Sequence, residues 1–167
     1  DGLQVNHFAA INIDEHRLPN NSLYLSILNE RMELLRNAGI PLHVQDARDY
    51  HALTRLLDEL NPQVVVQLAA VSHSNRSNKD PHSTFDHSLR TLENALDSVK
   101  KTAEHFIYLS SSMVYGNFQE QSVTEDANCN PIGIYGALKF SGEKIVKAYN
   151  QVFDLPYSII RPSALYG

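Results

Sequence analysis

The sequence contains a tyrosine and a lysine four positions apart, Tyr135 and Lys139, in the segment YGALK. Residues at this spacing lie on the same face of a helix, so the two side chains can meet. A nearby ammonium group favours the ionised phenol and lowers its pKa, and a phenolate near neutral pH can remove a proton from an alcohol. The pair therefore predicts an acid/base residue with a lysine that tunes it.

A run of three serines precedes this pair by about the length of a loop. Ser110, Ser111 and Ser112 follow the apolar stretch 106–109, which predicts a hydroxyl-rich turn at the end of a strand. A serine hydroxyl there can orient the substrate hydroxyl that Tyr135 deprotonates. Together these residues indicate hydride transfer between an alcohol and a nicotinamide cofactor bound beside it.

The segments around these residues alternate between apolar strands and amphipathic helices. Leucines three and four apart predict the helices, and Gly39 and Asn61–Pro62 end the first two. This alternation is typical of a parallel sheet with helices on both faces. The predicted strands are the end of 5–13, then 41–44, 64–68, 105–109 and 157–160; the predicted helices are 25–35, 53–60, 84–101 and 135–153, the last with Ile145, Tyr149 and Val152 on its apolar face; and the predicted loops are 72–82 and 117–134.

In this order, four segments resemble the extended short-chain dehydrogenase/reductase superfamily, and within it the NAD-dependent epimerase/dehydratase family. They are VVVQLAA (64–70), FIYLSSSMVYG (106–116), YGALK (135–139) and YSIIRP (157–162). The resemblance extends from about Ile11 to Gly167 and implies that 1–167 is a partial NAD(P)-binding domain, an α/β Rossmann-type doubly wound parallel sheet. The family's first strand, Gly-rich loop and C-terminal substrate domain have no counterpart, so we expect a fragment that binds NAD weakly or not at all and has no turnover by itself.

The resemblance also implies contacts with the cofactor. Asp14 would bind the adenosine ribose and favour NAD, although it also suits a cap or turn, and Arg17 leaves NADP open. Asp46, with the backbone of Ala47, would contact the adenine; alternatively Asp46 would cap the next helix, a role that Asp49 suits better. The other predicted cofactor-binding residues are Leu68, Ala69, Ala70, Ser110, Tyr135, Lys139 (on the nicotinamide ribose) and Pro162.

The catalytic serine follows from the same resemblance. Ser111 lies four residues before Tyr115, as the family's serine or threonine does, and Ser112 would replace it in a shorter turn. Glucose-type dehydratases carry an Asp-Glu pair where this chain has Ser112 and Met113, and methionine cannot transfer a proton, which argues against that reaction. The predicted catalytic residues are Ser111, Tyr135 and Lys139, and the predicted substrate-binding residues are Ser72, Ser111, Ser112, Met113 and Tyr135.

These residues lead us to expect an NAD-dependent nucleotide-sugar epimerase, of the UDP-hexose or UDP-hexuronate 4-epimerase type, that oxidises its substrate transiently to a keto sugar. A nucleotide-sugar reductase or dehydrogenase and a non-catalytic NAD-binding scaffold are the alternatives. Ala164 and His87 replace asparagines that are common in the family, so the substrate stays open. Relatives usually pair through 84–101 and 135–153, which implies a homodimer of the full-length protein.

The composition argues against several other classes of protein. A net charge of −5 gives no basis for nucleic-acid binding, and no apolar run is long enough to span a bilayer. The single cysteine, Cys129, and the lack of a signal-peptide pattern predict a cytoplasmic protein. His73, His82 and His87 lack zinc-ligand spacing, so no metal is expected, and no G-x-S-x-G hydrolase motif is present.

Overall fold

The computed structural model describes residues 21–71, 74–118 and 121–164, which divide into two compact units, Asp1–Asp46 and Ala47–Gly167. The strand predicted at the end of 5–13 lies outside the described residues, as do Asp14 and Ser72.

The first unit contains helix α2, Asn21–Asn37, as the leucine spacing predicts. Its end is the expected glycine: Gly39 has a φ of +67°, and the amide of Ile40 donates to the carbonyl oxygen of Leu35 at 2.9 Å. The strand predicted at 41–44 is wrong, because 40–46 is irregular and Val44 is largely exposed. An apolar segment becomes a strand only when a neighbouring strand takes up its hydrogen bonds, and local sequence does not determine that pairing.

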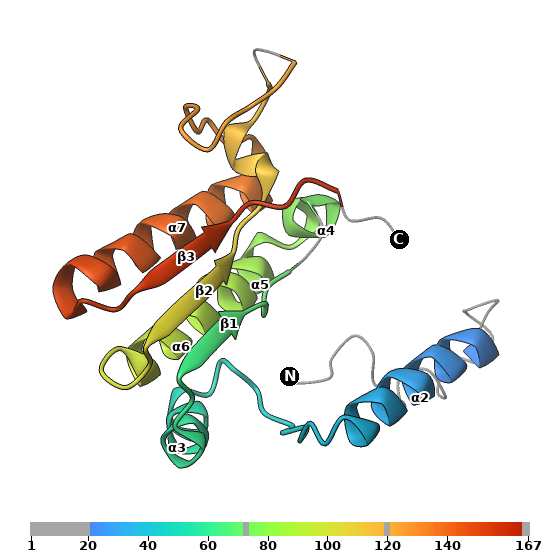
Figure 1. Ribbon diagram of the computed structural model, residues 1–167. Helices are drawn as coiled ribbons and strands as arrows, with labels where there is room; N and C mark the ends of the chain where they lie inside the picture. Colours follow the sequence, from blue (N-terminus) through green and yellow to red (C-terminus); the bar gives the residue numbers. More distant parts are fainter. Residues whose placement is uncertain (1–20, 72–73, 119–120, 165–167) are drawn as a thin grey trace. The chain divides into compact units, whose positions relative to one another are not determined.

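The second unit contains a three-stranded parallel sheet in the order β1-β2-β3 (Figure 1). The strands are β1 (Val64–Gln67), β2 (His105–Leu109) and β3 (Tyr157–Ile160), which confirms the three predicted here. In register, Val66 pairs with Ile107, and Ile107 pairs with Ser158. Because the strands are parallel, their carboxyl ends meet at one edge of the sheet.

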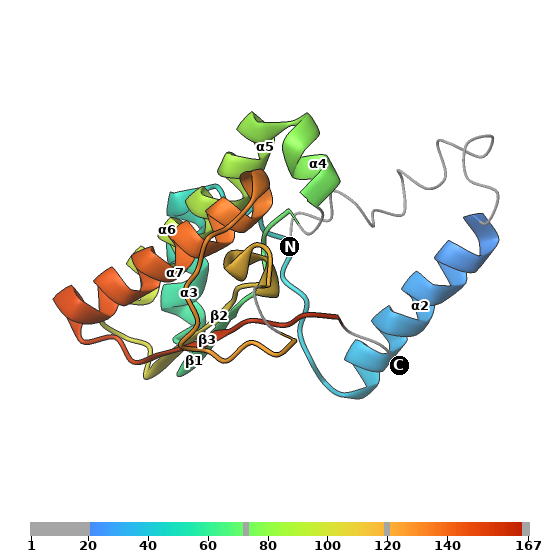
Figure 2. The ribbon, with the colours of Figure 1, turned by 90° about the horizontal axis from the view of Figure 1, so that it is seen from above.

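Helices α6 (Thr91–Val99) and α7 (Gly133–Phe153) cover one face of this sheet, as Figure 2 shows. Helix α3 (Tyr50–Leu60), capped by Asp49 as expected, packs beside α6. The core between helices and strands consists of Leu92, Ala95, Leu96, Val99, Phe106, Tyr108, Val146 and Leu155.

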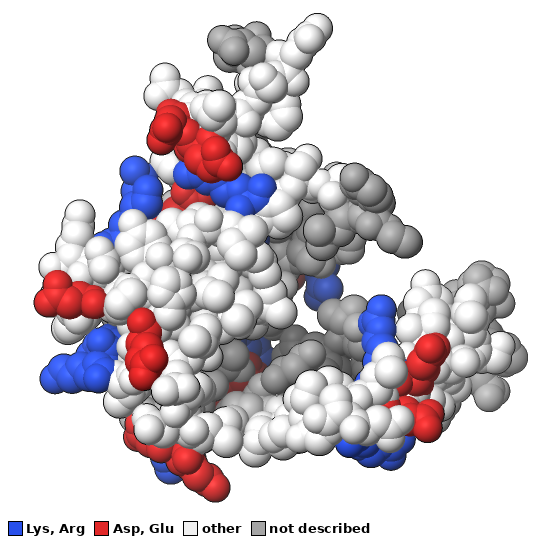
Figure 3. Space-filling view, viewed as in Figure 1, with Lys and Arg blue, Asp and Glu red and all other residues white. Residues whose placement is uncertain are grey.

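The opposite face of the sheet is not buried within this unit. Val64 and Val66 on β1 are each 51% exposed, and Figure 3 shows mostly uncharged side chains over the strands. The sequence predicted helices on both faces; in the described part of Ala47–Gly167 they lie on one. Continuously apolar strands can be buried on both faces, but they are buried only where another element packs on each face.

The segment 72–82, predicted as a loop, is helical over much of its described length. Helices α4 (Ser74–Lys79) and α5 (Pro81–Phe85) occupy it, and a π-helical turn, Asp86–Arg90, leads into α6. Asp80 starts α5, because its carboxylate accepts from the amide of Ser83 at 3.1 Å and Pro81 occupies the first turn. Polar composition suggested a loop, but the Asp-Pro pair is a helix-start signal that outweighs it.

Helix α7 begins at Gly133, two residues before the predicted start, and the preceding 117–132 is irregular where described. Its buried face is centred on Leu138, Gly142 and Val146. Val152, predicted on the apolar face, is 69% exposed. Ile145 and Tyr149, the other two residues predicted on that face, are half-buried, pack against the core and also line a surface groove.

Candidate active site

The predicted site residues of the second unit gather at the carboxyl edge of the sheet. The serine turn, defined here as Ser110–Ser112, leaves β2 beside the segment that leaves β3. The amide of Ser110 donates to the carbonyl oxygen of Ile160 at 2.8 Å, and that of Ser112 donates to the carbonyl oxygen of Pro162 at 3.0 Å. The backbone therefore holds the serine turn and Pro162 together.

Ser111 has the geometry expected of a positioned hydroxyl. It is the N-cap of a short 3-10 helix, Ser112–Tyr115, and its Oγ accepts a hydrogen bond from the amide of Met113 at 3.2 Å. Because this bond uses the oxygen as an acceptor, the hydroxyl proton can be donated to a substrate. The side chain of Ser111 is largely buried, so the cap fixes its direction.

The start of α7 packs directly on this turn. A Cβ at Gly136 would lie 2.8 Å from the carbonyl oxygen of Met113, so only glycine allows this approach. Tyr135 precedes Gly136 at this contact with the 3-10 helix that follows the serine turn. The structure thus brings together two segments that are separated by a loop in the sequence.

Lys139 lies under Tyr135 on the same helix face. Its Nζ is 5.9 Å from the centroid of the Tyr135 ring and donates to the carbonyl oxygen of Leu109, the last residue of β2, at 2.6 Å. Lys139 is only 7% exposed, and burial lowers the pKa of its ammonium from 10.5 to about 8. This side chain joins α7 to the strand that carries the serine turn.

This buried ammonium predicts a specific pH dependence of stability. The pKa of Lys139 is lower in the folded chain than in the unfolded one, so the unfolded chain binds more protons between about pH 8 and pH 10.5. The free energy of unfolding therefore gains a rising contribution across that window, at most about 3 kcal/mol. We expect Lys139→Met to remove this rise. We also expect the variant to be more stable than the wild type near pH 7.

Urea unfolding at intervals from about pH 7 to about pH 11 would measure the effect. Lys144→Met is the matched control, because Lys144 is an exposed lysine on the same helix. Other titrating groups are common to both variants and cancel in the comparison. Parallel pH profiles for the two variants would contradict the prediction.

A buried carboxylate beside the site escaped the sequence reasoning. Glu143 is completely buried and accepts from Ser110 Oγ at 2.6 Å and from Arg161 Nε and Nη2 at 2.8 and 2.7 Å. Burial by itself would raise the pKa of Glu143, but these hydrogen bonds hold it below its usual value. A signal was available, because Tyr135, Lys139 and Glu143 repeat every four residues.

This contact changes the role open to Ser110, which we predicted to bind the cofactor. Its buried hydroxyl donates to Glu143 and its amide donates to Ile160, so both of these donors are used within the protein. His87, another departure from the family pattern, has its Nδ1 2.7 Å from the carbonyl oxygen of Ser83, four residues earlier in the helical segment.

The predicted small-residue turn follows β1 at the same edge. Leu68 and Ala69 are exposed and Ala70 is half-buried. The carbonyl oxygen of Ala69 is held by Gln67 Nε2 at 3.1 Å and Thr91 Oγ1 at 3.2 Å. These bonds fix the turn without using side chains that would block it.

The predicted adenine contacts fall on either side of the boundary between the units. Asp46 is the last residue of the first unit, where its carbonyl oxygen accepts from Gln45 Nε2 at 3.0 Å. Ala47 opens the second unit, and its carbonyl oxygen accepts from the buried Asn94 Nδ2 at 2.9 Å.

Two further findings concern the described part of the chain. Its residues contain no group of three His, Cys, Asp or Glu side chains arranged to hold a metal ion. Among its helices, none combines the length and the apolar character that crossing a membrane requires.

Comparison with known proteins finds relatives that include nucleotide-sugar epimerases and dehydratases. UDP-glucuronate 4-epimerase 1 of Arabidopsis thaliana is 29% identical over 151 residues, which are 89% of this chain and 35% of that protein. A dTDP-glucose 4,6-dehydratase of Xanthomonas campestris is 29% identical over 155 residues, 86% of this chain and 44% of that protein. The chain thus spans less than half the length of these relatives.

Solved structures extend the likeness to the fold. The UDP-glucuronic acid 4-epimerase of Bacillus cereus, in complex with UDP-glucuronic acid and NAD, matches with a TM-score of 0.66 and 27% identity, over 76% of this chain and 41% of that one. The model of the NAD dependent epimerase/dehydratase family matches residues 16–167. With its parallel sheet, its serine turn and its Tyr135–Lys139 pair, the chain belongs to the NAD-dependent epimerase/dehydratase family.

Proposed function

We propose that this chain carries the catalytic residues of an NAD-dependent nucleotide-sugar 4-epimerase, acting on a UDP-hexose or UDP-hexuronate. The observation that supports this most directly is the buried Lys139, which lies under Tyr135 and bonds to the strand end that carries Ser111. The relatives named as 4-epimerases add to this support.

Each of the three residues would have a distinct task. Tyr135 would take the proton of the sugar hydroxyl and later return it, while Ser111 would donate a hydrogen bond that orients that hydroxyl. Lys139 would hold a positive charge beside the phenol, with its Nζ 5.9 Å from the ring centroid. NAD, when bound, supplies a reversible acceptor for the hydride. Loss of the hydride would leave a keto sugar, and the ketone would take the hydride back on its opposite face.

The residues at the sheet edge suit NAD. The exposed Ala69 and the half-buried Ala70 lie just after β1, and their small side chains allow close approach of a nucleotide to the backbone. Lys139 uses one ammonium hydrogen on Leu109, and the group has two more with which to hold ribose hydroxyls. Pro162 lies beside the serine turn, where the nicotinamide end would lie.

A dehydratase reaction fits these residues less well, although one relative is named as a dehydratase. Water loss needs an acid and a base next to the catalytic serine. Here the following residues are Ser112 and Met113, and the thioether of Met113 cannot transfer a proton. An epimerase, a reductase and a non-catalytic scaffold differ in whether they form an epimer and whether they consume cofactor.

The test uses the protein expressed from its complete reading frame. It would be incubated with UDP-glucose or UDP-glucuronate without added cofactor, and NMR would follow the 4-epimer. An epimer formed without net consumption of cofactor supports the proposal. Consumption of NAD(P)H with a keto sugar would instead indicate a reductase, and NAD binding without either reaction would indicate a scaffold.

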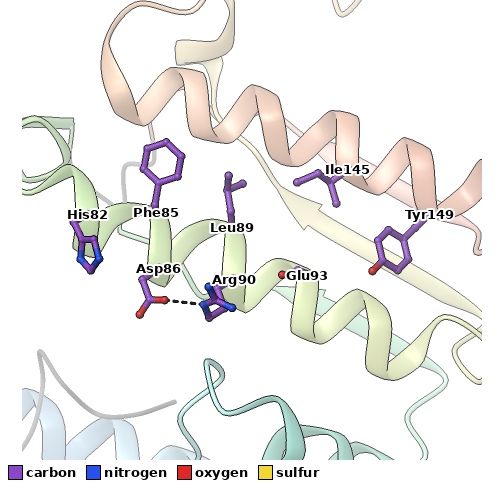
Figure 4. Close-up of a pocket in the computed structure, with 8 residues that line it drawn as sticks. All are labelled: His82, Phe85, Asp86, Leu89, Arg90, Glu93, Ile145 and Tyr149. Atoms are coloured by element: carbon purple, nitrogen blue, oxygen red, sulfur yellow. Dashed lines mark hydrogen bonds and ion pairs between the residues drawn. The ribbon is translucent and has the colours of Figure 1, made fainter.

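We also propose that the protein pairs with a second copy through α5–α6 and α7. A groove of about 470 Å³ lies between them, and its lining residues are drawn in Figure 4: His82, Phe85, Asp86, Leu89, Arg90, Glu93, Ile145 and Tyr149. Phe85 and Leu89 point toward α7, where Ile145 and Tyr149 lie, and Phe85 is half exposed. Exposed apolar side chains of this kind favour burial against a partner.

Replacing Phe85 tests this pairing. We expect Phe85→Ser to shift the protein from dimer toward monomer in sedimentation velocity, with the dissociation constant raised at least about tenfold by loss of a large apolar side chain. Leu60→Ser is the matched control, since Leu60 is similarly exposed on α3. Equal sedimentation coefficients for both variants would contradict the pairing.

A further inference from the structure

Arg161 is the centre of a hydrogen-bonded cluster that the proposed mechanism does not use. Its Nε and Nη2 donate to Glu143 on α7 at 2.8 and 2.7 Å. Its Nη1 donates to the hydroxyl of Tyr115 at 2.9 Å and to the carbonyl oxygen of Glu125 at 3.0 Å. One side chain therefore joins α7, the end of the short 3-10 helix and Glu125 in the loop segment 121–132.

Glu143 holds that guanidinium in a fixed place. A carboxylate that accepts two parallel bonds from an arginine determines both the position and the plane of the guanidinium. Glu143 is completely buried and is also tied to Ser110, the residue before Ser111. The same ion pair is thus bonded to the serine turn on one side and to the loop on the other.

The loop itself is closed at its base. Gly116, which precedes the loop, has a φ of +70°, and a Cβ there would lie 2.1 Å from the carbonyl oxygen of Asn130, so the backbone before the loop lies close to Asn130 near its far end. Between these ends, the bond from Arg161 to Glu125 attaches the loop to the body of the unit. A surface loop that loses such an attachment opens more readily.

We propose that Arg161, held by Glu143, is a positioning residue that fixes the loop segment 121–132 against the serine turn and so shapes the substrate side of the site. The effect on substrate rests on the proposed function, whereas the coupling between Arg161 and the loop does not. Arg161 touches no reacting group, so its removal affects how the substrate is bound more than how protons move.

Cys129 provides a reporter of the loop, because it is the single cysteine of the sequence and is half-buried there. We expect its rate of reaction with a thiol reagent to rise about tenfold in Arg161→Lys, since a lysine cannot make the same four bonds, and to rise also in Tyr115→Phe. Arg55→Lys and Tyr157→Phe are the matched controls, and Cys129→Ser is the blank.

Kinetics supply the second measurement, on the protein from the complete reading frame. We expect Arg161→Lys to raise KM for the UDP-sugar about tenfold and to change kcat by less than about threefold. A Cys129 response with an unchanged KM would overturn the effect on substrate. Turnover absent in the wild type, together with the Cys129 response, would refute the proposed function and support the coupling.

Unchanged Cys129 reactivity in folded Arg161→Lys and Tyr115→Phe would overturn the coupling itself. Circular dichroism would establish that the variants are folded. Should Arg161→Lys not fold, Tyr115→Phe decides the question, because it removes one hydroxyl and keeps the ring over which the guanidinium of Arg161 lies at 4.9 Å.

Discussion

Tyr135→Phe is expected to lower kcat for epimerisation by about 10² to 10⁴-fold while leaving the protein folded. The phenol oxygen is the one atom removed, and it is the atom that would exchange a proton with the sugar. Because the ring remains, its packing near Lys139 and the turn around Gly136 should be preserved. NMR detection of the 4-epimer, with wild type and variant at equal concentration, measures the effect.

The matched control for this substitution is Tyr157→Phe. Tyr157 is a half-buried tyrosine on β3 that packs against the core, away from the serine turn. Its loss of a hydroxyl should change kcat by less than about twofold. If Tyr135→Phe kept most of the wild-type rate, the acid/base role would have to be assigned to another group.

Gly142→Ala is expected to destabilise the fold by about 2–3 kcal/mol. An added Cβ would lie 2.2 Å from the hydroxyl oxygen of Tyr108 and 2.6 Å from its Cζ, inside the core between α7 and β2. Tyr108 is buried and cannot swing aside without moving its neighbours. This cost exceeds the gain of about 1 kcal/mol that replacing glycine with alanine gives in an ordinary helix.

Urea unfolding of the variant and of Ser141→Ala would measure this difference. Ser141 is the adjacent, exposed position, where alanine should be neutral or slightly stabilising. Adding Tyr108→Phe to Gly142→Ala removes the oxygen at 2.2 Å but leaves the ring carbon, so part of the loss should return. A Gly142→Ala protein as stable as the wild type would show that the helix and strand can separate at little cost.

Much of the local structure followed from the sequence. Periodic leucines with a helix stop predicted α2 and α3, and short apolar runs predicted β1, β2 and β3. The spacing of Tyr135 and Lys139 predicted their common helix face, which the structure confirms. These features are local, because they depend on the periodicity and termination of single segments.

Pairing and burial were decided only by tertiary structure. The segment 41–44 has the composition of a strand but is irregular, and Val64 and Val66 are apolar but half exposed, because neighbours from elsewhere in the chain determine both properties. The segment 74–82 shows the opposite error, because its polar residues predict a loop although Asp80 caps a helix there.

The same distinction between local sequence and tertiary structure applies to the candidate site. The sequence by itself determined which residue types were present, namely a serine turn, a tyrosine and a lysine, and thereby the class of chemistry. Only the fold decided that Lys139 is buried against Leu109 and that Ser110 turns to Glu143. Likewise, Arg161 is joined to Tyr115 and Glu125, which lie 46 and 36 residues away in the chain. Charge pairs and burial of this kind depend on three-dimensional proximity, which single-sequence patterns do not contain.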